Sequence, residues 1–184
     1  PSGCTRMGSC FPQATAFDQP LAAPDTGSVT SLRATLGETG AFNQPLGLDT
    51  SRVGTMASMR RAALAFNHSL PLDTNRVAEA QDMLYGAASF AQPPDFDARS
   101  VTTMQAMLHS AAAFDRPLAL DTGRVTDVSY MFKRCDGLNQ PLAFDTGSVT
   151  TTFETFRAAT AFNQPLSNWG TGAVVVMSKL LDDA

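Results

Sequence analysis

Six aspartates at a constant spacing form the most regular set of metal-binding side chain types in this sequence. They recur every 24 residues (for example 49 − 25): Asp25, Asp49, Asp73, Asp97, Asp121 and Asp145. Ca²⁺ takes roughly six to eight oxygen ligands, so a stacked carboxylate row has suitable chemistry for that ion. Aspartate also accepts hydrogen bonds from backbone N–H groups in turns, and Arg52, Arg76 and Arg124 follow three of these aspartates closely enough to neutralise them. We favour the turn interpretation and keep Ca²⁺ binding by this row as the alternative.

The remaining polar residues do not form a recognisable catalytic or cofactor motif. The sequence contains no Gly-rich phosphate loop, nucleophile elbow, His-Glu zinc motif or paired-cysteine metal spacing. His68 occupies a position where other copies of a repeat have Gln, and His109 is predicted on the outward side of a helix. We therefore predict no enzyme activity, no catalytic residue and no cofactor.

The three cysteines, Cys4, Cys10 and Cys135, also fall at repeat positions that carry small or apolar residues in other copies. Free cysteine is often buried as a small hydrophobe. We interpret all three as buried thiols, and a disulfide between Cys4 and Cys10 stays open as the alternative.

The elements that position these residues come from one repeating stretch, whose cleanest copy is the hexapeptide Ala-Phe-Asn-Gln-Pro-Leu at 41–46. The phenylalanine of this stretch recurs first after 25 residues (42 − 17) and then every 24 residues (66 − 42 through to 162 − 138). The series is Phe17, Phe42, Phe66, Phe90, Phe114, Leu138 and Phe162. A constant period in this range indicates a solenoid, in which each repeat buries its apolar side against its neighbours. We predict one repeat domain over 1–184, with a half repeat at 1–16, six repeats at 17–161 and a final repeat at 162–184.

Each repeat is predicted to contain one short strand, one turn and one short helix. Apolar and small residues alternate at 45–48, 117–120 and 141–144, which is the period of a strand with one buried face. Apolar residues three and four apart, such as those at 53, 56, 59 and 63, are typical of one helical face. The sequence thus predicts an α/β solenoid with parallel strands, a stacked column of phenylalanines, and a row of Asn side chains that satisfies backbone groups.

Two surfaces of this solenoid are predicted to bind a protein partner. One is a floor of small, nearly uncharged strand residues: Ala22, Gly47, Pro71, Asp95, Ala119, Ala143 and Ser167. The other is a basic and aromatic set on the helix side, with one repeat position shared by Arg61, Tyr85, His109, Lys133 and Arg157, and with Arg60 and Arg134 beside it. Arg and Tyr are favoured residues at protein interfaces, and an ordinary solvated helix face is the alternative.

Composition excludes several classes of partner. The net charge of −4 disfavours nucleic acid and anionic membranes. No apolar run approaches the ~20 residues that span a bilayer, so direct membrane insertion is not expected. No targeting segment is visible in the sequence.

The repeat resembles that of the BspA-like leucine-rich-repeat proteins of microbial surfaces. The resemblance rests on Phe-Asn-Gln-Pro-Leu, then Asp-Thr-x-x-Val-Thr-x-Met-x-x-Met, and on residues 162–169, which match the usual Phe-Asn-Gln-Pro-Leu-Ser-Asn-Trp. It implies a right-handed leucine-rich-repeat solenoid with one short parallel strand and one short helix per 24–25-residue repeat. It also implies a secreted or surface-attached protein that acts in adhesion or protein contact. The 24-residue period and the single Trp depart from the pattern. A structural subunit of a larger, membrane-associated or organellar assembly is the alternative function.

Overall fold

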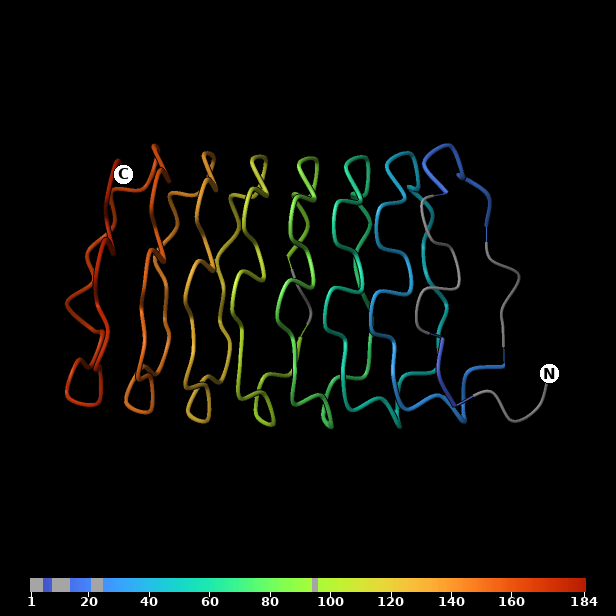
Figure 1. Cartoon of the computed structure of the whole chain (residues 1–184), viewed down its shortest axis with the longest axis horizontal. Helices are drawn as coiled ribbons and strands as arrows, with labels where there is room; N and C mark the ends of the chain where they lie inside the picture. Colours follow the sequence, from blue (N-terminus) through green and yellow to red (C-terminus); the bar gives the residue numbers. More distant parts are fainter. Residues whose placement is uncertain (1–4, 8–13, 21–24, 94–95) are drawn as a thin grey trace.

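The computed structural model describes residues 5–7, 14–20, 25–93 and 96–184. The chain winds into coils that stack along one long axis, and its two ends lie at opposite ends of the stack (Figure 1). Cys4, Cys10, Ala22 and Asp95 lie outside the described residues.

The predicted strand and helix of each repeat are wrong, and so is the α/β leucine-rich-repeat fold built from them. The described residues contain no helix and no extended strand; hence no described segment is an apolar helix long enough to cross a bilayer. Regular pairing between coils is limited to isolated parallel bridges. One column links Arg6, Ser31, Thr55, Glu79, Thr103, Asp127, Thr151 and Val176 in succession, and a further bridge joins Leu118 and Leu142.

Hydrogen bonding explains why the segments predicted as helices do not form them. In the coil at 53–65, the Met56 N–H donates to the Glu79 carbonyl at 3.0 Å, and the Ser58 N–H donates to the Gln81 carbonyl at 2.9 Å. An α-helix would use these N–H groups within its own turn. From Met56 to Ala62, every second N–H leaves the coil and binds the next one, so this stretch joins coils as a strand would.

Alternate N–H groups of the same stretch close tight turns within the coil. The Met59 N–H reaches the Met56 carbonyl at 3.1 Å, and the Ala63 N–H reaches the Arg60 carbonyl at 3.1 Å. Ser58 has a φ of 56°, a left-handed conformation that interrupts an α-helix. The apolar spacing of three and four residues therefore reflects successive three-residue turns that direct their side chains into the core.

The predicted column of phenylalanines is confirmed over the central coils. Phe66, Phe90 and Phe114 have no exposed surface. The ring centroids of Phe66 and Phe90 lie 6.0 Å apart with 7° between the planes, and those of Phe90 and Phe114 lie 6.1 Å apart with 3°. The Phe90 ring is therefore covered by the rings of the coils before and after it. Cys135 is buried too, as predicted, and burial is the main cause that raises the pKa of its thiol to about 12.

The first and last steps of the repeat array are one residue longer than the others, and the bridges between coils keep the same positions paired. The bridges Arg6–Ser31 and Thr151–Val176 join residues 25 apart (31 − 6 and 176 − 151), whereas Thr55 and Glu79 are 24 apart. The extra residue in the first and last steps of the sequence is thus absorbed outside the paired positions.

The predicted row of Asn side chains is confirmed as a ladder between coils. The Asn67 N–H donates to Asn43 Oδ1 at 2.9 Å, and the Ala91 N–H donates to Asn67 Oδ1 at 3.0 Å. Gln92 Nε2 donates to the same Asn67 oxygen at 3.1 Å. Each side chain carbonyl therefore satisfies a backbone donor that no neighbouring backbone acceptor reaches.

Asn67→Ala should lower the free energy of unfolding by about 1–3 kcal/mol, because it leaves the Ala91 N–H and the Gln92 amide without their acceptor. Urea denaturation provides the measurement. Asn163→Ala is the matched control, because Asn163 Oδ1 at the same repeat position accepts no hydrogen bond from the described residues. Equal losses in the two variants would contradict a role for the ladder.

Candidate protein-binding surface

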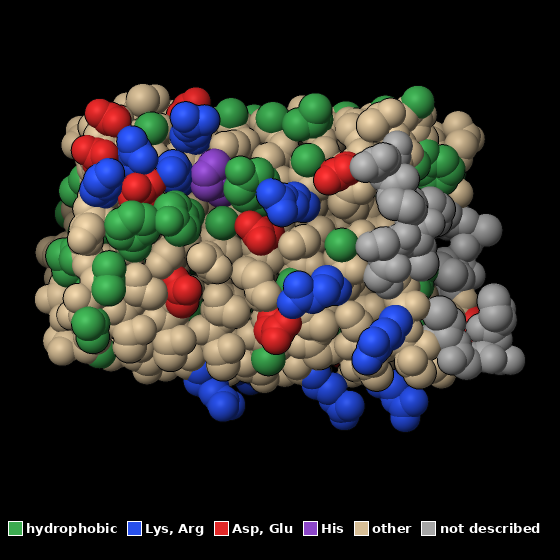
Figure 2. Space-filling model, viewed as in Figure 1, with side chains coloured by type: hydrophobic (Ala, Val, Ile, Leu, Met, Phe, Trp, Pro, Cys, Tyr) green, Lys and Arg blue, Asp and Glu red, His purple; other side chains and the backbone are tan. Residues whose placement is uncertain are grey.

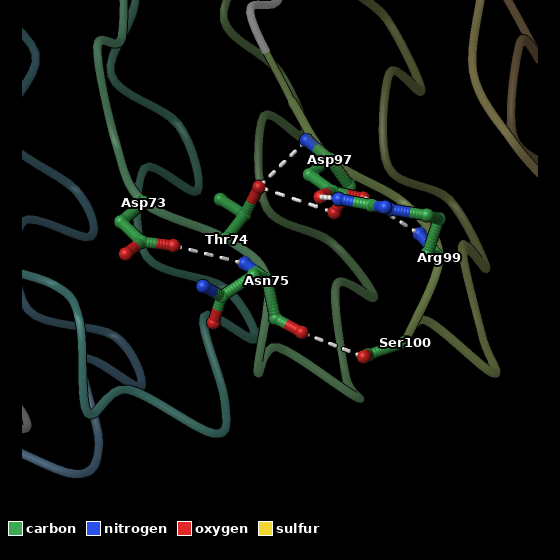
Figure 3. A network of polar contacts seen from close by, with 6 residues as sticks. All are labelled: Asp73, Thr74, Asn75, Asp97, Arg99 and Ser100. Carbon is green, nitrogen blue, oxygen red and sulfur yellow. Dashed lines mark hydrogen bonds and ion pairs between the residues drawn. The ribbon is translucent and has the colours of Figure 1, made fainter.

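The aspartate row makes turns within its own coils. In every member, Oδ1 accepts the N–H of the residue two positions later, as Asp73 does from Asn75 at 3.1 Å (Figure 3). The Arg99 side chain pairs with Asp97 and is the largest cause that lowers the pKa of this carboxyl to about 2. These contacts agree with the turn interpretation. No group of three or more His, Cys, Asp or Glu residues in the described ranges is placed to hold a metal ion.

In every copy except Asp97-Ala98, the aspartate is followed by a threonine that joins the turn to the next coil. Thr74 Oγ1 accepts the Asp97 N–H at 2.7 Å and donates to the Asp97 carbonyl at 3.1 Å (Figure 3). Thr74 is buried. The Asp-Thr sequence is therefore structural, because it closes a turn with one residue and binds the neighbouring coil with the other.

His68 also has a structural place. Its Nε2 lies 3.1 Å from the Asn43 carbonyl oxygen, and the ring is half-buried. It takes over the contact between coils that Gln side chains make elsewhere in the ladder, such as Gln92 to Asn67.

Arg61, Tyr85 and His109, which share one repeat position, stack on one another in three successive coils. We call Arg61, Tyr85, His109, Lys133, Arg134 and Arg157 the Arg/Tyr stripe. The Arg61 guanidinium carbon lies 4.8 Å from the Tyr85 ring centroid. The Tyr85 and His109 rings are stacked at 4.4 Å with 16° between their planes. Figure 2 shows Lys and Arg side chains gathered beside a histidine on this face.

The stripe ends in an ion-pair cluster around Glu154. Lys133 Nζ lies 2.6 Å from Glu154 Oε2, Arg157 Nη1 lies 3.2 Å from the same oxygen, and Lys179 Nζ lies 3.9 Å from Oε1. The Lys133 hydrogen bond is the largest cause that lowers the pKa of Glu154. Sequence reasoning missed this cluster, because Glu154 occupies a repeat position that carries Ala106 and other unrelated residues.

A second aromatic contact that sequence reasoning missed lies next to the stripe. The Tyr130 and Phe153 rings meet edge to face at 5.3 Å, and Lys133 Nζ lies 5.2 Å from the Tyr130 ring centroid. Both aromatic side chains are half-buried. The two residues do not share a repeat position, so the period gave no signal for this pair.

Arg60 does not belong to this surface, although the sequence predicted it there. It has no exposed surface, and its guanidinium lies between the Phe42 and Phe66 rings, at 4.8 Å and 3.9 Å from their centroids. Leu36 and Leu84 stand at the equivalent positions of the neighbouring repeats, and these apolar residues could have indicated a buried position. A partner cannot contact this side chain in the folded protein.

The predicted floor of small residues lies on the surface as expected. Gly47, Pro71, Ala119, Ala143 and Ser167 are all exposed. Because these side chains offer little area and few polar groups, the floor gives a partner weaker anchors than the Arg/Tyr stripe does.

The His109 ring is held neutral by its surroundings. Burial is the first cause that lowers the pKa of His109 to about 4, and Lys133, Arg134 and Arg61 add positive charge around it. Its Nδ1 lies 2.8 Å from Ser110 Oγ. The imidazole therefore contributes a flat, uncharged ring to the stripe at neutral pH.

His109→Gln should remove a pH dependence of stability between about pH 6.5 and pH 4. Because the folded pKa lies below the ordinary value of 6.5, the folded state binds fewer protons, and stability is lost as the pH falls through this window. We expect a loss of about 1–2 kcal/mol in the unaltered protein, reduced by solvent screening of a half-buried ring. Urea denaturation at several pH values measures the difference between the two proteins. Parallel pH profiles would contradict the prediction.

Comparison with protein families gave one match across the chain. The family model described as "Mycoplasma protein of unknown function, DUF285" matches residues 2–95 and 93–184. No curated protein matches the chain, and no solved structure matches it.

Proposed function

We propose that this chain, which belongs to the DUF285 family, is a non-enzymatic module that binds another protein through the Arg/Tyr stripe. The observation that carries the proposal is the stack of Arg61, Tyr85 and His109, one side chain from each of three successive coils. Arg61 is exposed, and Tyr85 and His109 are half-buried. Stacked side chains are already ordered before binding, so a partner meets a surface whose conformational entropy has largely been lost.

Most titratable side chains that could act in catalysis make structural contacts, which supports a binding role over catalysis. The aspartates accept hydrogen bonds in turns, as Asp73 does from Asn75. His68 contacts a backbone carbonyl, and the Cys135 thiol is buried with a raised pKa. A general base or nucleophile needs a free, accessible site beside its substrate, and these groups have structural partners.

The resemblance to BspA-like surface repeats supports the same proposal, because that resemblance implies a role in adhesion or protein contact. It extends the proposal to a secreted or cell-surface location. The repeat motif at 41–46 and 162–169 is the support for this location.

The test is capture of partners from an extract of the source organism with three immobilised proteins. The double variant Arg61→Ala with Tyr85→Ala should lose the captured partner, with affinity reduced at least about tenfold. The matched control, Arg52→Ala with Arg124→Ala, changes two exposed arginines that follow the aspartate turns. This variant should retain the captured partner. A partner that binds the stripe variant and the unaltered protein equally would contradict the proposal.

A structural subunit of a larger assembly is the second candidate. It is favoured by apolar side chains exposed on the coil at 174–184: Val175 is 83% exposed and Leu181 is 50% exposed. Burying such side chains against another subunit would stabilise an assembly. Light scattering of the purified protein is the measurement, and a monodisperse monomer over a wide concentration range would contradict this candidate.

A further inference from the structure

We propose that the Arg/Tyr stripe binds an extended acidic peptide segment, in which two carboxylates four residues apart contact Arg61 and Arg134. This inference rests on the proposed function and names the chemistry of its partner. Four features of the described residues carry it: the availability of the two guanidinium groups, the positive surroundings of His109, the covered faces of Tyr85, and the spacing of the coils.

Arg61 and Arg134 are the stripe cations that form no ion pair within the described part of the chain. Lys133 and Arg157 pair with Glu154, whereas Arg61 and Arg134 are exposed and make no ion pair with the described residues. A guanidinium presents a planar fork of donors that binds a carboxylate through two hydrogen bonds. These two groups are therefore ready to bind carboxylates from outside the chain.

Three cations act on the His109 ring, and one of them, Lys133, is paired with Glu154. The charges that act on His109 come from Lys133, Arg134 and Arg61, and each of them opposes protonation of the ring. The charges of Arg61 and Arg33 act on the Asp82 carboxyl, whose pKa is nevertheless raised, with burial as the largest cause. An anionic segment that crosses this centre is thus attracted by the same two arginines that anchor it.

The aromatic stack favours a peptide over a nucleic acid. Single-stranded nucleic acids bind through bases that stack on free aromatic faces. The Arg61 guanidinium lies over the Tyr85 ring, and the His109 ring stacks on the Tyr85 ring at 4.4 Å. With its ring engaged in this way, Tyr85 is a poor stacking site for a base, whereas a peptide needs no free ring face to bind the two arginines.

The coil spacing selects the distance between the carboxylates. Arg61 and Arg134 lie three coils apart, and stacked chains are about 4.8 Å apart, so the two positions are separated by about 14 Å along the axis. An extended peptide rises about 3.3–3.4 Å per residue, so residues i and i+4 lie about 13–14 Å apart. These residues also point to the same side of an extended chain. Acidic residues at i and i+4 therefore match the two arginines.

The inference is tested with two synthetic peptides of equal composition, titrated by calorimetry at low ionic strength, where surface charges are least screened. One peptide carries glutamates at i and i+4, separated by threonine and serine, and its isomer carries the same glutamates side by side. The unaltered protein should bind the first peptide at least about fivefold tighter than the isomer. Arg61→Gln with Arg134→Gln should weaken binding of the first peptide at least about tenfold. Arg52→Gln with Arg124→Gln, which removes the same charge from another surface, should leave it unchanged.

Several outcomes would overturn the inference. These are equal affinity for the two peptides, equal weakening by the control variant, tighter binding of a single-stranded oligonucleotide of equal charge, and the absence of binding heat with the unaltered protein. Thermal unfolding of both double variants confirms that they remain folded. If Arg61→Ala with Tyr85→Ala abolishes capture of a natural partner while the acidic peptides fail to bind, the proposed function stands and only this inference is wrong.

Discussion

Arg60→Leu is expected to raise the free energy of unfolding by about 3 kcal/mol, because it removes an uncompensated charge from the core. The Arg60 side chain has no exposed surface, and its Nε, Nη1 and Nη2 atoms have no hydrogen-bond partner among the described residues. The coils before and after carry Leu36 and Leu84 at the same repeat position, both fully buried. The core at this repeat position therefore accommodates a leucine side chain in both neighbouring coils.

The favourable contacts of Arg60 are smaller than its desolvation penalty. Its guanidinium contacts the Phe42 and Phe66 rings, and a desolvated cation–π contact contributes about 2 kcal/mol. Removing a charge from water costs several kcal/mol even after relaxation. Burial lowers the pKa of Arg60 to about 9, so the group stays charged at pH 7. The destabilisation is full below pH 9 and decreases above it, because the folded state releases this proton before the unfolded state does.

Urea denaturation of Arg60→Leu at pH 7 measures the effect. The control is Arg61→Leu, which makes the same chemical change at an exposed neighbour and should alter stability by no more than about 0.5 kcal/mol. Unchanged or lower stability of Arg60→Leu would show that the guanidinium has a compensating partner inside the fold.

Phe90→Ala is expected to lower the free energy of unfolding by about 4 kcal/mol, because it leaves a cavity in the centre of the column. Phe90 is fully buried between the Phe66 and Phe114 rings. The loss combines the transfer free energy of the ring with the contacts that both neighbouring rings forfeit.

The distribution of this loss should follow the stack. In a repeat array each coil contacts its neighbours, so hydrogen exchange should accelerate most in the coils that carry Phe66 and Phe114 and least at the ends. Phe153→Ala is the control, since Phe153 is half-buried and makes its edge contact with Tyr130 outside the column. Uniform acceleration along the whole chain, or equal losses for the two variants, would contradict nearest-neighbour coupling.

The contacts that the sequence revealed are those that repeat from coil to coil. Phe66 and Phe90 share a repeat position and stack, and Asn43 and Asn67 share another and bind each other through side chain and backbone. The same holds for the Tyr85 and His109 rings of the stripe. A period is enough to predict these contacts, because a stack brings equivalent residues together whatever the path of the chain within one coil.

The path of the chain within one coil was predicted wrongly. The spacing of Val53, Met56 and Met59 fits a helical face, and it fits a series of three-residue turns equally well. The choice depends on where the N–H groups donate, and the Met56 N–H donates to Glu79 in the next coil. Helix propensity is local, whereas this hydrogen bond exists only when the neighbouring coil is in place.

By itself, the sequence determined the period of the stack, the buried phenylalanines of its central coils and the repeat position shared by Arg61, Tyr85 and His109. The tertiary structure alone decided the backbone conformation, the placement of Arg60 in the core and the gathering of Lys133, Arg157 and Lys179 around Glu154. The physical reason is that translation between coils carries repeated residues into contact automatically. Contacts between residues at different repeat positions depend on how each coil folds and how far each side chain reaches, and no period encodes them.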